Sequence, residues 1–135
     1  MGLSGATAMK KARAVFIPIP LYGGEVVLCR TREEWSAVAA KFGMPQDDVI
    51  GTLDITHELQ CDDGRRVSMI GVFDGAIPTL AHELLHAAIA TLAHVGIPIN
   101  QETDEALTYL FDHLLTAALP PFLTAQIAHK GKGRG

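Results

Sequence analysis

The chain of 135 residues carries 11 lysines and arginines against 15 aspartates and glutamates, a formal net charge of −4 at pH 7. The charges are scattered, which argues against nucleic acid as a partner. No stretch approaches the roughly 18 consecutive apolar residues of a membrane helix, which argues against a membrane partner. Length and composition predict one domain, residues 1–135, with flexible ends at about 1–12 and 130–135. Cys29 and Cys61 match no paired-cysteine motif, so we expect reduced thiols and a cytoplasmic protein.

The first predicted elements are an extended segment, a short strand and a helix. Residues 14–22 contain two prolines, which disfavour a helix, and residues 24–29 form a β-branched run typical of a strand. Thr31 precedes Glu34 by three residues, which is the signature of a capping box at a helix start. The apolar stripe of this helix consists of Trp35, Val38, Ala39 and Phe42.

A hairpin is predicted next along the chain. Residues 48–59 and 66–73 flank Asp63-Gly64, a strong signal for a tight turn between antiparallel strands. The segment 66–73 is mostly apolar on both faces, which predicts a strand well inside the sheet or covered on both sides.

Two helices are predicted in the second half of the chain. The first has Pro78 in its first turn and ends before Gly96 and Pro98. The second runs from about residue 103 to 118 and is expected to stop at Pro120-Pro121, with a further element possible in residues 120–128. Its apolar face consists of Leu107, Leu110, Phe111, Leu114 and Leu115.

The first of these helices contains the motif His82-Glu83-Leu84-Leu85-His86. Residues four apart lie one above the other on a helix, so His82 and His86 can bind one zinc ion, with each nitrogen about 2.0–2.1 Å from the metal. Glu83 lies about 100° around the helix, where it can act as general base on a zinc-bound water. Ala90 and Ala93 follow on the same side and leave room for a metal and a substrate.

A catalytic zinc usually has three protein ligands, so a third must come from elsewhere. His94 is about 12 Å further along the helix than His86, which is too far. The start of the next helix offers three carboxylates, and we predict Glu105 because it lies one turn inside, ahead of Glu102 and then Asp104. Two adjacent helices joined by a short turn are expected to pack side by side, so that the polar strip of the second meets the histidine face of the first. Each carboxylate alone could instead serve the helix dipole.

This order of motifs resembles the zincin metallopeptidases, specifically the gluzincin branch, in which a strand precedes the HExxH helix and a later helix supplies a glutamate ligand. Residues 82–115 also resemble small HExxH proteins encoded by phages and prophages. The resemblance covers about residues 65–118. It departs from the common gluzincin pattern, which has an aspartate four residues after the ligand glutamate, where this chain has Tyr109.

The resemblance implies an α+β fold, a small zincin-like domain with a short, mostly antiparallel sheet packed on the HExxH helix and on a ligand-bearing helix. It implies Zn²⁺ as cofactor and residues 66–73 as a sheet edge beside the metal, where a substrate backbone pairs. Tyr109 and His113 are then candidate donors to the oxyanion, although a solvated helix face is the favoured interpretation for both.

The sequence leaves three functions to compare. The first is a zinc-dependent metallopeptidase that cuts a peptide or protein substrate in the cytoplasm, with Glu83 catalytic and His82, His86 and Glu105 as metal ligands. The alternative is a non-catalytic zincin-like binding module of phage or prophage origin. The third is an interaction protein without a metal, in which the motif arose by chance. The substrate and the oligomeric state stay open.

Overall fold

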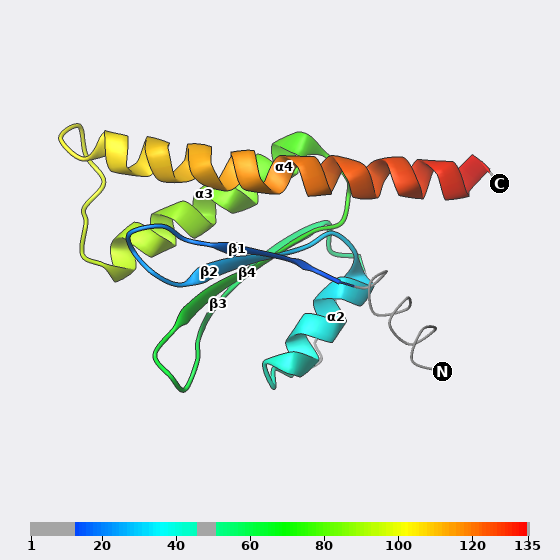
Figure 1. Cartoon of the computed structure of the whole chain (residues 1–135), viewed down its shortest axis with the longest axis horizontal. Coiled ribbons are helices and arrows are strands. Elements are labelled where there is room, and N and C mark those ends of the chain that lie inside the picture. Colours follow the sequence, from blue (N-terminus) through cyan, green and yellow to red (C-terminus); the bar gives the residue numbers. More distant parts are fainter. Residues whose placement is uncertain (1–12, 46–50, 135) are drawn as a thin grey trace.

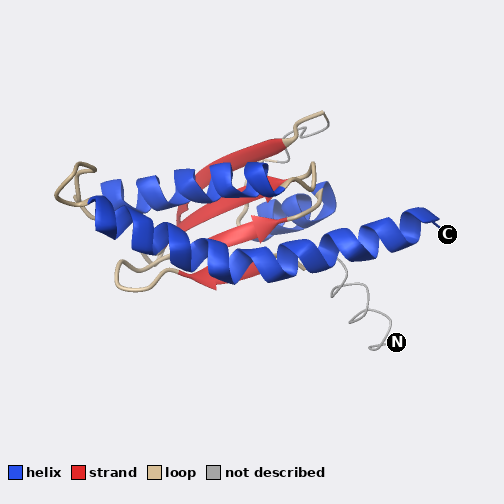
Figure 2. Ribbon diagram, turned by 90° about the horizontal axis from the view of Figure 1, so that it is seen from above, coloured by secondary structure: helices blue, strands red, loops and turns tan. Residues whose placement is uncertain are grey.

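The computed structural model describes residues 13–45 and 51–134, with side chains described as far as residue 125. Its elements are β1 (Val15–Pro18), β2 (Glu25–Cys29), α2 (Arg32–Lys41), β3 (Asp54–Gln60), β4 (Arg66–Val72), α3 (Ile77–His94) and α4 (Asp104–Arg134). Helices α3 and α4 cover one face of the sheet and α2 covers the other (Figure 1, Figure 2). The predicted α+β fold with a short, mostly antiparallel sheet is therefore confirmed. The flexible start predicted for residues 1–12 lies outside the described residues.

The four described strands form one sheet in the order β1-β2-β4-β3. The β1–β2 and β3–β4 pairs are antiparallel, and β2 and β4 run parallel. Strand β4 is therefore internal and every one of its residues is buried, as its two apolar faces predicted. Residues 66–72 do form a strand that packs against the HExxH helix α3, but the expectation that this segment would be the sheet edge was wrong, because β3 pairs outside it.

The predicted hairpin between β3 and β4 is confirmed. Gly64 in the turn has φ +89°, in the left-handed region that glycine adopts without strain. The amide of Cys61 donates to the carbonyl of Arg65 at 2.7 Å and closes the turn. The sequence signal in Asp63-Gly64 is local, and it sets the register of the whole strand pair.

Alternating residues of the strands enter two separate apolar layers, because successive side chains point to opposite faces of a sheet. The layer under α3 and α4 contains Ile17, Val26, Leu28, Ile70, Val72, Leu80, Leu84, Leu110, Leu114 and Phe122. The layer under α2 contains Val27, Cys29, Trp35, Val38, Val67 and Met69. The position of α3 over the sheet is thus set by apolar packing, independently of its histidines.

The start of α2 agrees with the predicted cap. Thr31 is the N-cap, and its hydroxyl accepts a hydrogen bond from the amide of Glu34 at 3.1 Å. The Glu34 carboxylate is buried and accepts from the backbone and guanidinium of Arg30 rather than from Thr31. The capping box is therefore shifted by one residue on its carboxylate side.

Helix α4 continues through Pro120 and Pro121 to Arg134, so the prediction that it stops at the prolines was wrong. The flexible end expected for residues 130–135 stays a prediction. An interior proline costs about 3 kcal/mol or more, because it removes an amide donor and crowds an earlier carbonyl. Beyond the prolines Phe122 is only 1% exposed, and burial of such a side chain contributes about 1.5–3 kcal/mol. Arg30 also donates to the carbonyl of Pro121 at 3.1 Å. Tertiary contacts therefore offset much of the local penalty.

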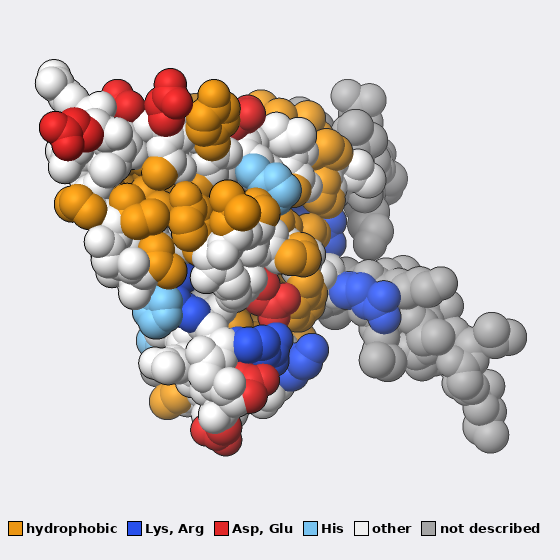
Figure 3. Space-filling view, turned by 60° about the vertical axis from the view of Figure 1, so that its left-hand side comes forward, with side chains coloured by type: hydrophobic (Ala, Val, Ile, Leu, Met, Phe, Trp, Pro, Cys, Tyr) orange, Lys and Arg blue, Asp and Glu red, His pale blue; other side chains and the backbone are white. Residues whose placement is uncertain are grey.

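The surface carries apolar side chains as well as charged ones. In Figure 3 hydrophobic side chains gather in a band beneath α4, above a group of charged residues. Leu21 and Ile99 are among the exposed large apolar residues of the described chain, at 95% and 47% exposure. None of its helices combines the length and the apolar character needed to cross a membrane.

Candidate metal site

Helix α3 carries the HExxH motif in its first half and begins close to the predicted position. The Asp74 carboxylate accepts from the amide of Ala76 at 3.0 Å and from the hydroxyl of Thr79 at 2.6 Å, which stabilises the first turn. Pro78 lies in that turn, where no amide donor is lost. Leu80, Leu84 and Leu92 are directed into the core, whereas His82 and His86 are exposed at the rim of the helix–sheet contact.

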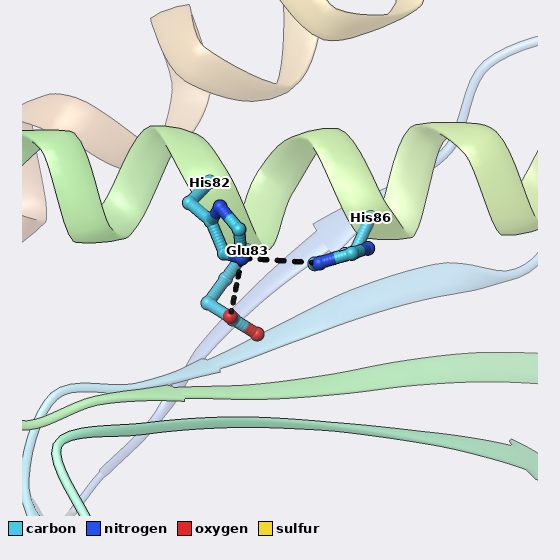
Figure 4. A group of neighbouring side chains, drawn as sticks. All are labelled: His82, Glu83 and His86. Atoms are coloured by element: carbon cyan, nitrogen blue, oxygen red, sulfur yellow. Dashed lines mark hydrogen bonds and ion pairs between the residues drawn. The ribbon is translucent and has the colours of Figure 1, made fainter.

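The two imidazoles are arranged as ligands of one metal would be. Their Nε2 atoms are 3.1 Å apart and the rings lie at 84° to each other. Two nitrogens bound tetrahedrally at about 2.0–2.1 Å from a zinc ion would be about 3.3 Å apart, so the observed spacing needs little adjustment. Glu83 Oε1 lies 3.8 Å from His82 Nε2. Figure 4 shows the three side chains converging on the side of α3 that faces the strands.

Glu83 differs from its neighbours because it is buried, with 4% of the residue exposed. Its Oε2 accepts a hydrogen bond from the hydroxyl of Thr56 in β3. Burial raises the pKa of the Glu83 carboxyl, and the nearby Asp54 carboxyl also raises it, whereas the Thr56 bond and His86 act to lower it. The net direction is upward, which holds Glu83 closer to neutrality than an exposed glutamate.

A hollow of about 340 Å³ opens between α3 and β3 beside this group. It is lined by Thr56, Glu58, Glu83, His86 and Ala90. Its volume is at the small end of the range typical of ligand pockets. The small side chain of Ala90 leaves room there, as predicted, and the carboxylate and one imidazole of the motif both face the hollow.

A buried arginine, Arg66, forms hydrogen bonds with residues of the elements that surround the hollow. Arg66 donates to Thr91 Oγ1 at 3.0 Å and to Ser68 Oγ at 3.1 Å, and it also pairs with the Glu58 carboxylate. Ser68 donates to the same Glu58 oxygen at 2.8 Å. This network ties β3, β4 and α3 together, so the strand that faces the histidines is held rigidly against their helix.

The polar face of α4 does not meet the histidines, so that expectation was wrong. The apolar face of α4 packs on α3 and the sheet instead, which leaves Tyr109 70% exposed and Asp112 and His113 exposed as well. Helices α3 and α4 run in opposite directions, with the start of α4 beside the end of α3 (Figure 1). In Figure 4 α4 passes α3 on the side away from the motif.

The predicted third ligand is consequently not with the pair. Glu105 is exposed in the first turn of α4, and Glu102 and Asp104 are exposed beside it. Within the described chain, the group of possible metal ligands consists of His82, Glu83 and His86, whose ligand atoms all lie within 4.8 Å of one another. Glu105 as a ligand stays a prediction without support from this geometry.

Strand β3 contributes site residues that were not predicted from the sequence. Asp54, Thr56 and Glu58 alternate along the strand and so share one face, the one turned toward α3. Alternation after the predicted hairpin could have grouped these three residues. It could not have shown which face of β3 packs on which helix, because that depends on the sheet order.

Comparison with known proteins adds no relative: no family model matches the chain, and neither curated proteins nor solved structures gave a match.

Proposed function

We propose that the protein is a zinc-dependent metallopeptidase that hydrolyses a peptide bond in the cleft between α3 and β3. His82 and His86 hold Zn²⁺ and Glu83 is the general base. The observation that carries this proposal is the pair of Nε2 atoms 3.1 Å apart beside a buried carboxylate, one oxygen of which is turned toward them. A purely structural metal site would have no use for that carboxylate.

The chemistry divides between the metal and the chain. A zinc ion held by the two imidazoles would supply the Lewis acidity that hydrolysis of an amide needs. Glu83 takes the proton of the attacking water through Oε1 and delivers it to the leaving amine. In the metal-free chain burial raises the pKa of the Glu83 carboxyl, whereas a bound cation would act to lower it and so favour the carboxylate that takes the proton.

The outer edge of β3 suits an extended peptide. The amide of Cys61 donates to Arg65 and the amide of Phe73 donates to Leu53, which marks both pairs as hydrogen-bonded ones. Hydrogen-bonded and non-hydrogen-bonded pairs alternate along an antiparallel ladder. Asp54, Thr56 and Glu58 fall in non-hydrogen-bonded pairs with β4, so their amides and carbonyls point to the outer edge. Pairing there would lay a peptide along the hollow, as β-augmentation does.

A cytoplasmic location and a phage or prophage origin belong to the same proposal. Both Cys29 and Cys61 are free, which suits a reducing compartment. The second candidate function is a non-catalytic zincin-like binding module. The observation that favours it is that the described chain brings only two imidazoles and Glu83 to the site, whereas a catalytic zinc usually has three protein ligands and an open position.

One experiment compares these functions on the purified full chain. We expect about one zinc per chain in wild type and none after His82→Ala with His86→Ala. Hydrolysis is followed with a library of fluorogenic peptides, and Glu83→Gln should keep its zinc and lose 10²-fold or more in turnover, the usual contribution of general base catalysis. Glu33→Gln, an exposed residue of α2, is the matched control.

The outcomes separate the three functions. An active Glu83→Gln variant would exclude the mechanism. Bound zinc with no hydrolysis by wild type would favour the binding module. If the variant without both histidines kept the zinc content of wild type, His82 and His86 would not be the residues that bind zinc.

A further inference from the structure

We infer that Thr56 is a positioning residue, whose hydroxyl holds the Glu83 carboxylate in the orientation that hydrolysis needs while its backbone lies at the peptide-binding edge. This inference rests on the proposed function and assigns a role that the HExxH motif does not contain.

The contact itself is specific to one oxygen. Thr56 Oγ1 donates to Glu83 Oε2, and the other oxygen, Oε1, is the one 3.8 Å from His82 Nε2. A carboxylate on a flexible stem rotates unless something fixes it. With Oε2 bound by the strand, Oε1 stays turned toward the imidazoles, where the attacking water has to be. A general base kept in this geometry avoids the loss of reaction rate that a misplacement of about 1 Å causes.

The position of Thr56 in β3 gives it a second contact. Its side chain points toward α3, and its register partner in β4 is Ile70, in a non-hydrogen-bonded pair. The amide and carbonyl of Thr56 therefore point outward, at the edge where an extended peptide would pair. One residue thus contacts the peptide through its backbone and the base through its side chain. A single strand therefore fixes the peptide-binding edge relative to the Glu83 carboxylate. The hydrogen bonds and ion pair of Arg66 hold this strand against α3.

Two substitutions separate the hydroxyl from the rest of the side chain. Thr56→Val keeps the branched shape that suits a strand and removes the donor, whereas Thr56→Ser keeps the donor. The backbone is unchanged in both. For the best-cleaved peptide of the fluorogenic library, we expect kcat of the zinc-loaded Thr56→Val variant to fall at least tenfold with KM within about twofold of wild type. Thr56→Ser should restore kcat to within about threefold. Thr124→Val, in the exposed part of α4, is the matched control and should match wild type.

A second measurement needs no activity. In metal-free protein, Thr56→Val should lower the urea midpoint, because it leaves a buried carboxylate oxygen without its donor. In a Glu83→Ala background the same substitution should cause no further shift, since the acceptor is gone. This double-mutant cycle reports whether Thr56 acts through Glu83.

The possible results distinguish a failure of the Thr56 inference from a failure of the proposed metallopeptidase function. If Thr56→Val turns over at the wild-type rate, or if Thr56→Ser is as slow as Thr56→Val, the positioning role is overturned and the metallopeptidase stands. A urea shift of equal size in both backgrounds overturns the contact on which the role depends. A wild type that hydrolyses no peptide overturns the proposed function and this inference together.

Discussion

At the scale of single residues, the environment of Glu83 makes its charge unfavourable for folding in the absence of a metal. Glu83 is 4% exposed and its carboxyl lies near that of Asp54, and burial is the larger cause of its raised pKa. A group whose pKa is higher in the folded than in the unfolded chain binds its proton more tightly when folded. Stability from this group is therefore present at low pH and is lost as pH rises through the two pKa values.

This gives a pH-dependent prediction for metal-free protein. Relative to wild type, Glu83→Gln should gain stability as pH rises from about 4, near the unfolded value of 4.5, to 7. The amide stays neutral, and it can still accept from Thr56. Urea unfolding of both proteins in the presence of a chelator, at steps of pH, measures the difference. A variant that loses stability against wild type over that range would contradict the raised pKa.

At the scale of elements, α4 is a helix whose course is set by what it packs against. Its two prolines would end an isolated helix, and the burial of Phe122 and the Arg30 contact to Pro121 favour continuation. Such a helix depends on its tertiary contacts more than α3 does, because the proline of α3, Pro78, lies in its first turn and its interior contains none.

We therefore expect Phe122→Ala to destabilise the protein by about 3–5 kcal/mol, the usual cost of removing a buried phenylalanine. Phe16→Ala is the matched control. Because Phe16 is 38% exposed, this variant should lose clearly less free energy of unfolding than Phe122→Ala. Urea unfolding of the three proteins measures both. Similar losses for the two variants would show that Phe122 does not hold the segment beyond the prolines in the core.

The third zinc ligand that the sequence predicted, Glu105, lies on a different helix from the two histidines. If Glu105 completes the coordination, Glu105→Ala should weaken zinc binding strongly. From its exposed position at the start of α4, outside the ligand group, we expect an affinity within about twofold of wild type. Competition with a zinc-binding dye measures it, with Glu102→Ala alongside. A loss of tenfold or more in Glu105→Ala alone would restore the sequence-based assignment.

At the scale of the whole molecule, zinc binding and folding are coupled. The two imidazoles come together only when α3 is helical, and α3 is held by the sheet and α4 through a shared apolar layer. A ligand that binds only the folded chain raises its stability by an amount set by ligand concentration over Kd.

Zinc at 100 times Kd should therefore add about 2.7 kcal/mol, which for a domain of this size raises Tm by about 10 °C. Calorimetry with zinc and with a chelator measures this shift. His86→Ala should show little of it, because one of the two imidazoles is gone, and this variant is the control. An equal rise of Tm in wild type and His86→Ala would place the zinc elsewhere on the protein.

The sequence by itself determined the features whose causes are local. Thr31 caps α2 because a hydroxyl reaches the amide three residues on, and Asp63-Gly64 turns because glycine tolerates a positive φ. His82 and His86 meet because residues four apart share a helix face, a consequence of helix geometry alone. The order of strand, helix, hairpin and two further helices followed from the same local periodicities.

Only the tertiary structure decided which elements lie against the motif. The sheet order makes β3 the edge and brings Thr56 to Glu83, although 27 residues separate them in sequence. Packing of the apolar face of α4 turns Glu105 to solvent, and burial of Phe122 continues the helix through two prolines. These outcomes depend on competition between apolar faces for the core. That competition is a property of the whole chain, so no short stretch of sequence contains its result.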